Sequence, residues 1–195
     1  FARITSFTAN FADTGAVQIS NCKTAIRNEA ADVIFSGSSN KIFACDSAFV
    51  IKGGIQVIDS GSVSANHFGL FASPLTGLNS AFPQINLQNT FIHANQQAVV
   101  SQNATSVLIE KNSVTQSTIP LPRIDLRRTS SLSSAQTIDY QIAGNQFSGV
   151  SAKTVCVKND SPGNLDFFRI QNNQIDTVIG IDGDTTYGIF VSGMV

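Results

Sequence analysis

A repeated pattern of apolar residues and asparagines constrains this chain more than any other feature of its sequence. The pattern reads apolar, any, apolar, any, any, Asn or a substitute, any, apolar. Its clearest copies are Val107-x-Ile109-x-x-Asn112-x-Val114, Tyr140-x-Ile142-x-x-Asn145-x-Phe147 and Phe168-x-Ile170-x-x-Asn173-x-Ile175. Self-similarity of this kind is typical of a solenoid, in which each repeat buries its apolar face against its neighbours.

Weaker copies extend the pattern towards the N-terminus, with Thr90, Asn66, Asp46 and Cys22 in the asparagine position. The positions 22, 46, 66, 90, 112, 145 and 173 lie 24, 20, 24, 22, 33 and 28 residues apart. This period predicts about seven coils over residues 15–195. The two longest intervals predict loop-like insertions near 117–137 and 158–166, where Pro, Ser and Gly gather. We expect residues 1–14 to be an N-terminal cap or the continuation of a longer chain.

Each copy predicts a β-strand with one inward face, followed by a turn at the asparagine position, where stacked Asn side chains can form a ladder. Further strands are predicted after the turn at 48–51, 98–100, 155–157 and 189–191, and before the pattern at 33–35 and 55–58. A leucine-rich repeat shares the core pattern but requires a Leu three residues earlier, and Leu165 alone meets that requirement. The sequence therefore predicts an all-β parallel β-helix, a single-stranded solenoid.

The composition excludes several classes of function. Only 13% of the residues are charged and the net charge is −1, so we expect no nucleic-acid partner. No apolar run approaches the roughly 20 residues of a membrane span, so we expect no membrane insertion. Cys22, Cys45 and Cys156 form no Cys-x-x-Cys pair, although Cys22 and Cys45 lie one repeat apart and can meet on adjacent coils. We expect neither a metal nor a cofactor, and three reduced thiols.

Over residues 15–195 this pattern resembles the right-handed parallel β-helix proteins of the pectate-lyase-like superfamily. The wealth of Asn, Ser and Thr, with few Lys, is similar to bacteriophage tailspikes and tail fibres. The resemblance implies a homotrimeric virion protein, extracellular, that binds and in some cases cleaves bacterial surface polysaccharide. A secreted polysaccharide lyase or glycoside hydrolase and a surface adhesin are the alternatives. The chain lacks the Asn-Thr-Asp, Asp-Asp and Gly-His-Gly series of polygalacturonases and the Trp-Ile-Asp-His segment of pectate lyases.

Four charged residues are the candidates for carbohydrate chemistry. Glycoside hydrolysis uses two carboxylates, and we expect Glu110, facing outward on its strand, and Asp125, in the following insertion, to be the catalytic pair. Arg127 and Arg128 are the candidates for gripping a sugar carboxylate in bidentate fashion. The competing interpretation is that all four are solvated surface charges.

Three minor features have simpler interpretations. His67 and His93 each lie close to a predicted turn, which favours surface histidines over a general base. The segment Asp182-Gly183-Asp184 is an incomplete calcium-loop pattern and is better explained as a plain turn. Phe1, Ile4, Phe7 and Phe11 have the spacing of a short amphipathic helix that would plug the first coil, with an extended segment as the alternative.

Overall fold

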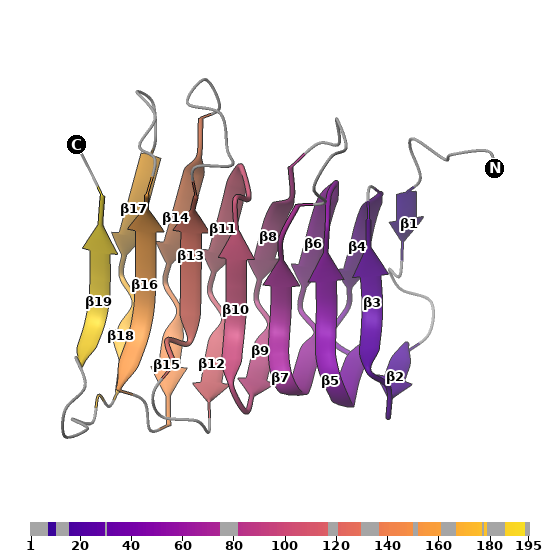
Figure 1. Ribbon diagram of the computed structural model, residues 1–195. Helices are drawn as coiled ribbons and strands as arrows, with labels where there is room; N and C mark the ends of the chain where they lie inside the picture. Colours follow the sequence, from indigo (N-terminus) through magenta and orange to yellow (C-terminus); the bar gives the residue numbers. More distant parts are fainter. Residues whose placement is uncertain are drawn as a thin grey trace.

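The computed structural model shows a row of stacked coils whose neighbouring strands run parallel (Figure 1). The structure describes residues 8–10, 16–29, 31–74, 82–116, 121–129, 137–149, 152–160, 167–176, 178 and 186–193. Within them the chain forms β-strands and turns and has no helix. The predicted fold class, an all-β parallel β-helix, is confirmed, and strands occupy the return paths where a leucine-rich repeat usually has helices.

Sheet A has seven strands and contains one strand from each coil. Its order follows the chain: β1 (Thr8–Asn10), β4 (Asp32–Ser36), β6 (Ile55–Asp59), β8 (Gln84–Gln88), β11 (Ser106–Glu110), β14 (Asp139–Ala143) and β17 (Phe167–Gln171). All of these strands pair in parallel. Seven successive strands agree with the predicted number of coils.

Sheet B has twelve strands and covers the remaining two sides of each coil. One side contains β2 (Gln18–Ser20), β9 (Phe91–Ala94), β12 (Ser113–Gln116), β15 (Gln146–Ser148) and β18 (Gln174–Ile175). The other contains β3 (Thr24–Asn28), β10 (Gln97–Gln102), β13 (Ile124–Arg128), β16 (Lys153–Asn159) and β19 (Tyr187–Ser192). Two long strands, β5 (Lys41–Ile51) and β7 (Ser62–Ala72), run along both sides. Figure 1 shows β3, β5, β7, β10, β13, β16 and β19 side by side in front of sheet A.

Inward side chains stack from coil to coil and form one apolar core between the sheets. In sheet A the inward column contains Phe35, Ile58, Leu87, Ile109 and Ile142, each at most 1% exposed. Parallel pairing in strict register places each of these side chains directly above the next, so every coil covers the apolar face of its neighbour. The alternation that the repeat predicts is therefore the alternation that builds the core.

A ladder of asparagines joins the coils at the turn after sheet A. The Asn145 amide accepts from the backbone N–H of Asn112 at 3.0 Å and donates to the carbonyl of Ile109 at 2.9 Å. Asn112 bonds Thr90 and Leu87 in the same way, and Asn173 bonds Asn145 and Ile142. These amides satisfy backbone groups that the turn would otherwise leave buried and unpaired. The predicted ladder is confirmed for positions 90, 112, 145 and 173.

For the N-terminal coils, the prediction assigned the wrong residues to the asparagine position of the repeat. In these coils Asn40 and Gly61 occupy the turn position after sheet A, and Cys22, Asp46 and Asn66 do not. Gly61 occupies an asparagine position because a Cβ atom there would lie 3.0 Å from the Phe35 ring. Segments 33–35 and 55–58, predicted as additional strands, are accordingly the sheet A strands of their coils. Cys22, Asp46 and Asn66 belong instead to a second turn, between the two sides of sheet B.

Other predictions have mixed outcomes. The strands predicted at 48–51, 98–100, 155–157 and 189–191 are confirmed in β5, β10, β16 and β19. The range 117–137, predicted as an insertion, contains β13, which pairs in register with β10 and β16. Likewise, Lys158 and Asn159 end β16, while 161–166 lie outside the described residues. The proposed N-terminal plug also lies outside them, although Thr8–Asn10 already pairs with β4.

Candidate functional site

The outer face of sheet A is a flat strip made by every second side chain of its strands. Three rows of outward side chains run along the coil axis in strict register. Towards the C-terminal end they are Gln84, Ser106, Asp139 and Phe167; Asn86, Leu108, Gln141 and Arg169; and Gln88, Glu110, Ala143 and Gln171. Uncharged polar groups dominate these rows, which gives the strip many hydrogen-bonding groups and little net charge.

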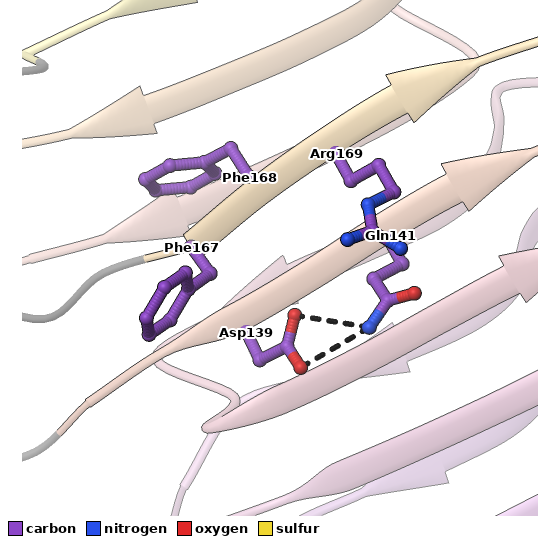
Figure 2. A pocket seen from close by; sticks show the side chains of 5 residues that line it. All are labelled: Asp139, Gln141, Phe167, Phe168 and Arg169. Atoms are coloured by element: carbon purple, nitrogen blue, oxygen red, sulfur yellow. Dashed lines mark hydrogen bonds between the residues drawn. The ribbon is translucent and has the colours of Figure 1, made fainter.

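A recess lies where this strip reaches its last two described strands, β14 and β17 (Figure 2). Asp139, Gln141, Phe167, Phe168 and Arg169 line it. Phe168 points to the coil interior, where its ring meets Tyr140 edge-on at a centroid distance of 5.5 Å. The adjacent Phe167 faces the opposite way and is 59% exposed. One aromatic side chain thus anchors the strand in the core while its neighbour presents a ring to solvent.

The polar groups of the recess are arranged by strand register. Asp139 lies beside Phe167, and Gln141 lies beside Arg169 on the neighbouring strand. The Gln141 amide nitrogen is 3.3 and 3.2 Å from the two Asp139 oxygens, as the dashed lines in Figure 2 show. Arg169 is exposed and has no hydrogen bond or ion pair within the described part of the chain. The recess therefore combines an exposed ring, an oriented carboxylate and amide, and an open guanidinium.

This combination suits a sugar. An exposed aromatic ring offers a large apolar surface with little entropy to lose, which is the form of contact that the apolar face of a pyranose needs. Carboxylate and amide oxygens accept hydrogen bonds from hydroxyls, while the amide and guanidinium donate them. A few convergent polar groups beside an apolar surface are the usual composition of a ligand site.

Glu110, a predicted catalytic residue, ends β11 on the outer face of sheet A as expected. Its carboxylate accepts a hydrogen bond from Gln88 at 3.3 Å and lies 3.6 Å from the Lys111 ammonium. Asp125, its predicted partner, is in β13 of sheet B. The two carboxylates lie on different sheets of the coil, so the structure does not bring them together on one face.

Asp125 and Arg127 form a closed pair on the outer face of sheet B. Arg127 donates from Nε to Oδ1 at 2.9 Å and from Nη2 to Oδ2 at 2.6 Å. The Asp125 side chain is 5% exposed and that of Arg127 is 42% exposed. Hydrogen bonding to Asp125 raises the pKa of Arg127. The guanidinium fork that was expected to hold a sugar carboxylate already holds a protein carboxylate.

Arg128, the other predicted carbohydrate ligand, does not face solvent. It follows Arg127 on β13, so strand alternation turns its side chain to the opposite side, and it is 0% exposed. It is one of the largest fully buried side chains of the molecule. Its place in a strand, not in an exposed insertion, is the reason why it is buried.

Buried groups surround Asp125 on sheet B. Cys156 is its register neighbour on β16 and is 2% exposed. Burial raises the pKa of the Cys156 thiol, and burial together with a hydrogen bond to Cys156 raises the pKa of Tyr187. Cys22 and Cys45 meet on adjacent coils as predicted, and their hydrogen bond raises the pKa of Cys22 to about 11. All three cysteines are free thiols.

Sequence reasoning missed the recess, although the signal for it was present. The copies that contain Tyr140-x-Ile142 and Phe168-x-Ile170 were aligned correctly, and their alternation places Asp139, Gln141, Phe167 and Arg169 outward. A phenylalanine at an outward strand position is the unusual feature, because Phe is mostly buried. Reading the outward positions of aligned repeats, and not only the inward ones, would have found this set.

The remaining candidates offer no further chemistry. His93 faces outward on β9, where its Nδ1 lies 2.7 Å from the Thr115 hydroxyl, and His67 is exposed within β7. Residues 182–184 lie outside the described part of the chain. Among the described residues, no cluster of three or more His, Cys, Asp or Glu side chains is arranged to hold a metal ion. The same residues include no helix with the length and apolarity needed to cross a bilayer.

Comparison with known proteins found no similar protein. The chain matches no protein-family model, no curated protein and no solved structure.

Proposed function

We propose that this chain is a β-helix segment of a bacteriophage tailspike or tail fibre that binds bacterial surface polysaccharide through the outer face of sheet A. The observation that carries the proposal is the recess of β14 and β17, where the exposed Phe167 ring stands beside the polar groups of Asp139, Gln141 and Arg169. The neutral polar rows on β8 and β11 continue from the recess along the axis and extend the surface over which a linear glycan can lie.

We propose that the site binds the glycan and does not cleave it. Hydrolysis of a glycosidic bond uses two carboxylates that flank the bond. Among the residues that line the recess, Asp139 supplies the one carboxylate, and Gln141 donates hydrogen bonds to it. Glu110 lies one strand away on the same face and is a further hydrogen-bonding group for the same glycan.

A homotrimer is part of this proposal. Phe43 and Phe91 are 40% and 46% exposed on strands of sheet B. Neighbouring subunits that packed against sheet B would cover such side chains and leave the strip on sheet A facing outward. Subunit association favours apolar side chains at the contact, and glycan binding favours polar side chains on the exposed surface.

The direct test is binding of purified capsular and lipopolysaccharide glycans from a panel of bacteria, measured by biolayer interferometry. We expect at least one glycan to bind, and Phe167→Ala to weaken that binding, because the ring supplies the apolar contact. Phe91→Ala is the control, since it removes an exposed ring from sheet B; where light scattering shows that it keeps the oligomeric state of the unaltered protein, glycan binding should be unchanged. Failure of every glycan to bind, or equal loss in both variants, contradicts the proposal. Light scattering on the same samples tests the trimer.

A further inference from the structure

Arg169 differs from the other arginines that the structure describes. Arg27 pairs with Glu29 at 2.8 Å, and Arg127 grips Asp125 with two nitrogens. Arg123 and Arg128 are 0% exposed. Arg169, in contrast, stands on the outer face of sheet A, exposed and with no acidic partner in the described segments. A planar guanidinium without a protein anion is suited to bind a carboxylate from outside.

We propose that the recess selects an acidic sugar, a uronate or a sialate, whose carboxylate is bound by Arg169 while its ring lies on Phe167. This inference rests on the proposed glycan-binding function and adds the class of sugar. Phe167 and Arg169 lie two residues apart on one face of β17, which corresponds to roughly 7 Å along a strand. A ring and an exocyclic carboxylate of one sugar can meet both side chains at that separation.

Asp139 fixes the direction in which the acidic sugar binds. It lies beside Phe167 and not beside Arg169, and Gln141 holds both of its oxygens. A sugar carboxylate near Asp139 meets a like charge, whereas one near Arg169 meets a counter-charge, so the reversed orientation is disfavoured. In the favoured orientation the sugar hydroxyls face Asp139, which can accept their hydrogen bonds.

The test compares glucuronate- and sialate-containing tetrasaccharides with the same compounds after reduction of their carboxyl groups to alcohols. Isothermal titration calorimetry at one salt concentration gives the affinities. We expect one acidic compound to bind at least about tenfold more tightly than its reduced form, the effect of one charge-assisted hydrogen-bonded contact. Arg169→Gln should remove that preference by lowering the acidic affinity alone, and Arg169→Lys should retain part of it. Arg27→Gln is the matched control and should bind as the unaltered protein does.

The outcomes separate this inference from the function on which it rests. If acidic and reduced compounds bind equally, and Phe167→Ala weakens both while Arg169→Gln changes neither, the glycan site stands and the selection of acidic sugars is wrong. If neither kind of compound nor any panel glycan binds, the proposed function fails and the inference fails with it. Weaker binding of the acidic compounds in Arg169→Gln, with the reduced compounds unaffected, supports both.

Discussion

Two arginines on the outer faces of the coil, Arg127 on sheet B and Arg169 on sheet A, have opposite surroundings. Arg127 closes on Asp125, two residues earlier on the same strand face, in a bidentate pair of which the carboxylate is nearly buried. Arg169 has Phe167 at the equivalent place, two residues earlier on its own strand. With an aromatic ring in the place of a carboxylate, Arg169 has no ion pair among the described residues.

The difference shows why conspicuous charges are poor guides to a binding site on this fold. In a strand, residues two apart project from the same face, so Asp-x-Arg brings its own counter-ions together. Asp125 and Arg127, which stand out in the sequence, therefore satisfy each other. The residues available to a ligand are the ones whose strand neighbours leave them unsatisfied.

Removal of Arg127 should cost the most stability. Arg127→Gln leaves Asp125, which is 5% exposed, without its counter-ion, and we expect the free energy of unfolding to fall by about 2 kcal/mol. The value is below that of a fully buried pair because Arg127 itself is partly exposed. Urea unfolding followed by circular dichroism measures it.

The control for that variant is Arg27→Gln, which breaks the exposed pair with Glu29 and should change stability by less than about 0.5 kcal/mol. Addition of Asp125→Asn to Arg127→Gln should restore part of the loss, because the buried charge is then gone. Equal effects of the two single variants would show that the Asp125–Arg127 pair is solvated and that the contrast with Arg169 is unfounded.

On sheet A, Phe167→Ala should separate binding from stability. The Phe167 side chain is 59% exposed, so its removal should change the free energy of unfolding by less than about 0.5 kcal/mol. We expect glycan affinity to fall about tenfold, which corresponds to about 1.4 kcal/mol. Titration calorimetry and urea unfolding on the same preparation measure the two effects. A large stability loss without a change in affinity would place Phe167 in a structural role.

A substitution can also make the surroundings of Arg169 like those of Arg127. Gln171 is two residues after Arg169 on the same face of β17, so Gln171→Glu would provide Arg169 with an internal carboxylate like the one that holds Arg127. We expect affinity for acidic glycans to fall several-fold and affinity for their reduced forms to stay unchanged, because the guanidinium is then occupied. Gln171→Ala is the control and should retain acidic binding. Loss of acidic binding in both variants would mean that Gln171 itself contacts the glycan.

The smallest expected effect is a pH dependence of stability from the Cys156 thiol, which lies beside Asp125. Burial raises the pKa of Cys156, so folded chains hold the thiol proton to higher pH than unfolded chains do. Below a pH of about 8.5 both states keep the proton and the thiol adds no pH dependence. Above it, the unfolded state loses its proton first, and the free energy of unfolding should decline as the pH rises. Urea unfolding from pH 7.5 to 10 should show this decline, and Cys156→Ala should reduce its slope.

The sequence predicted the coil and missed the site for physical reasons. Apolar alternation and turn asparagines report directly on the core and the ladder, so Val107, Ile109 and Asn112 gave the right register. The same reading failed at Gly61, where packing against Phe35 overrode the asparagine preference. It failed at Arg128 because a strand lay within a segment rich in turn residues. That no described residue pairs with Arg169 depends on side chains from two strands, which one repeat does not reveal.

Hydrogen–deuterium exchange of the protein with and without its tightest-binding acidic oligosaccharide shows directly whether the glycan lies on β14 and β17. We expect peptides covering 139–143 and 167–171 to become protected, because the glycan lies on β14 and β17, and the peptide covering 124–128 to be unchanged. Protection at 124–128 with none at 167–171 would place the ligand on the Asp125–Arg127 pair and contradict a glycan site on sheet A.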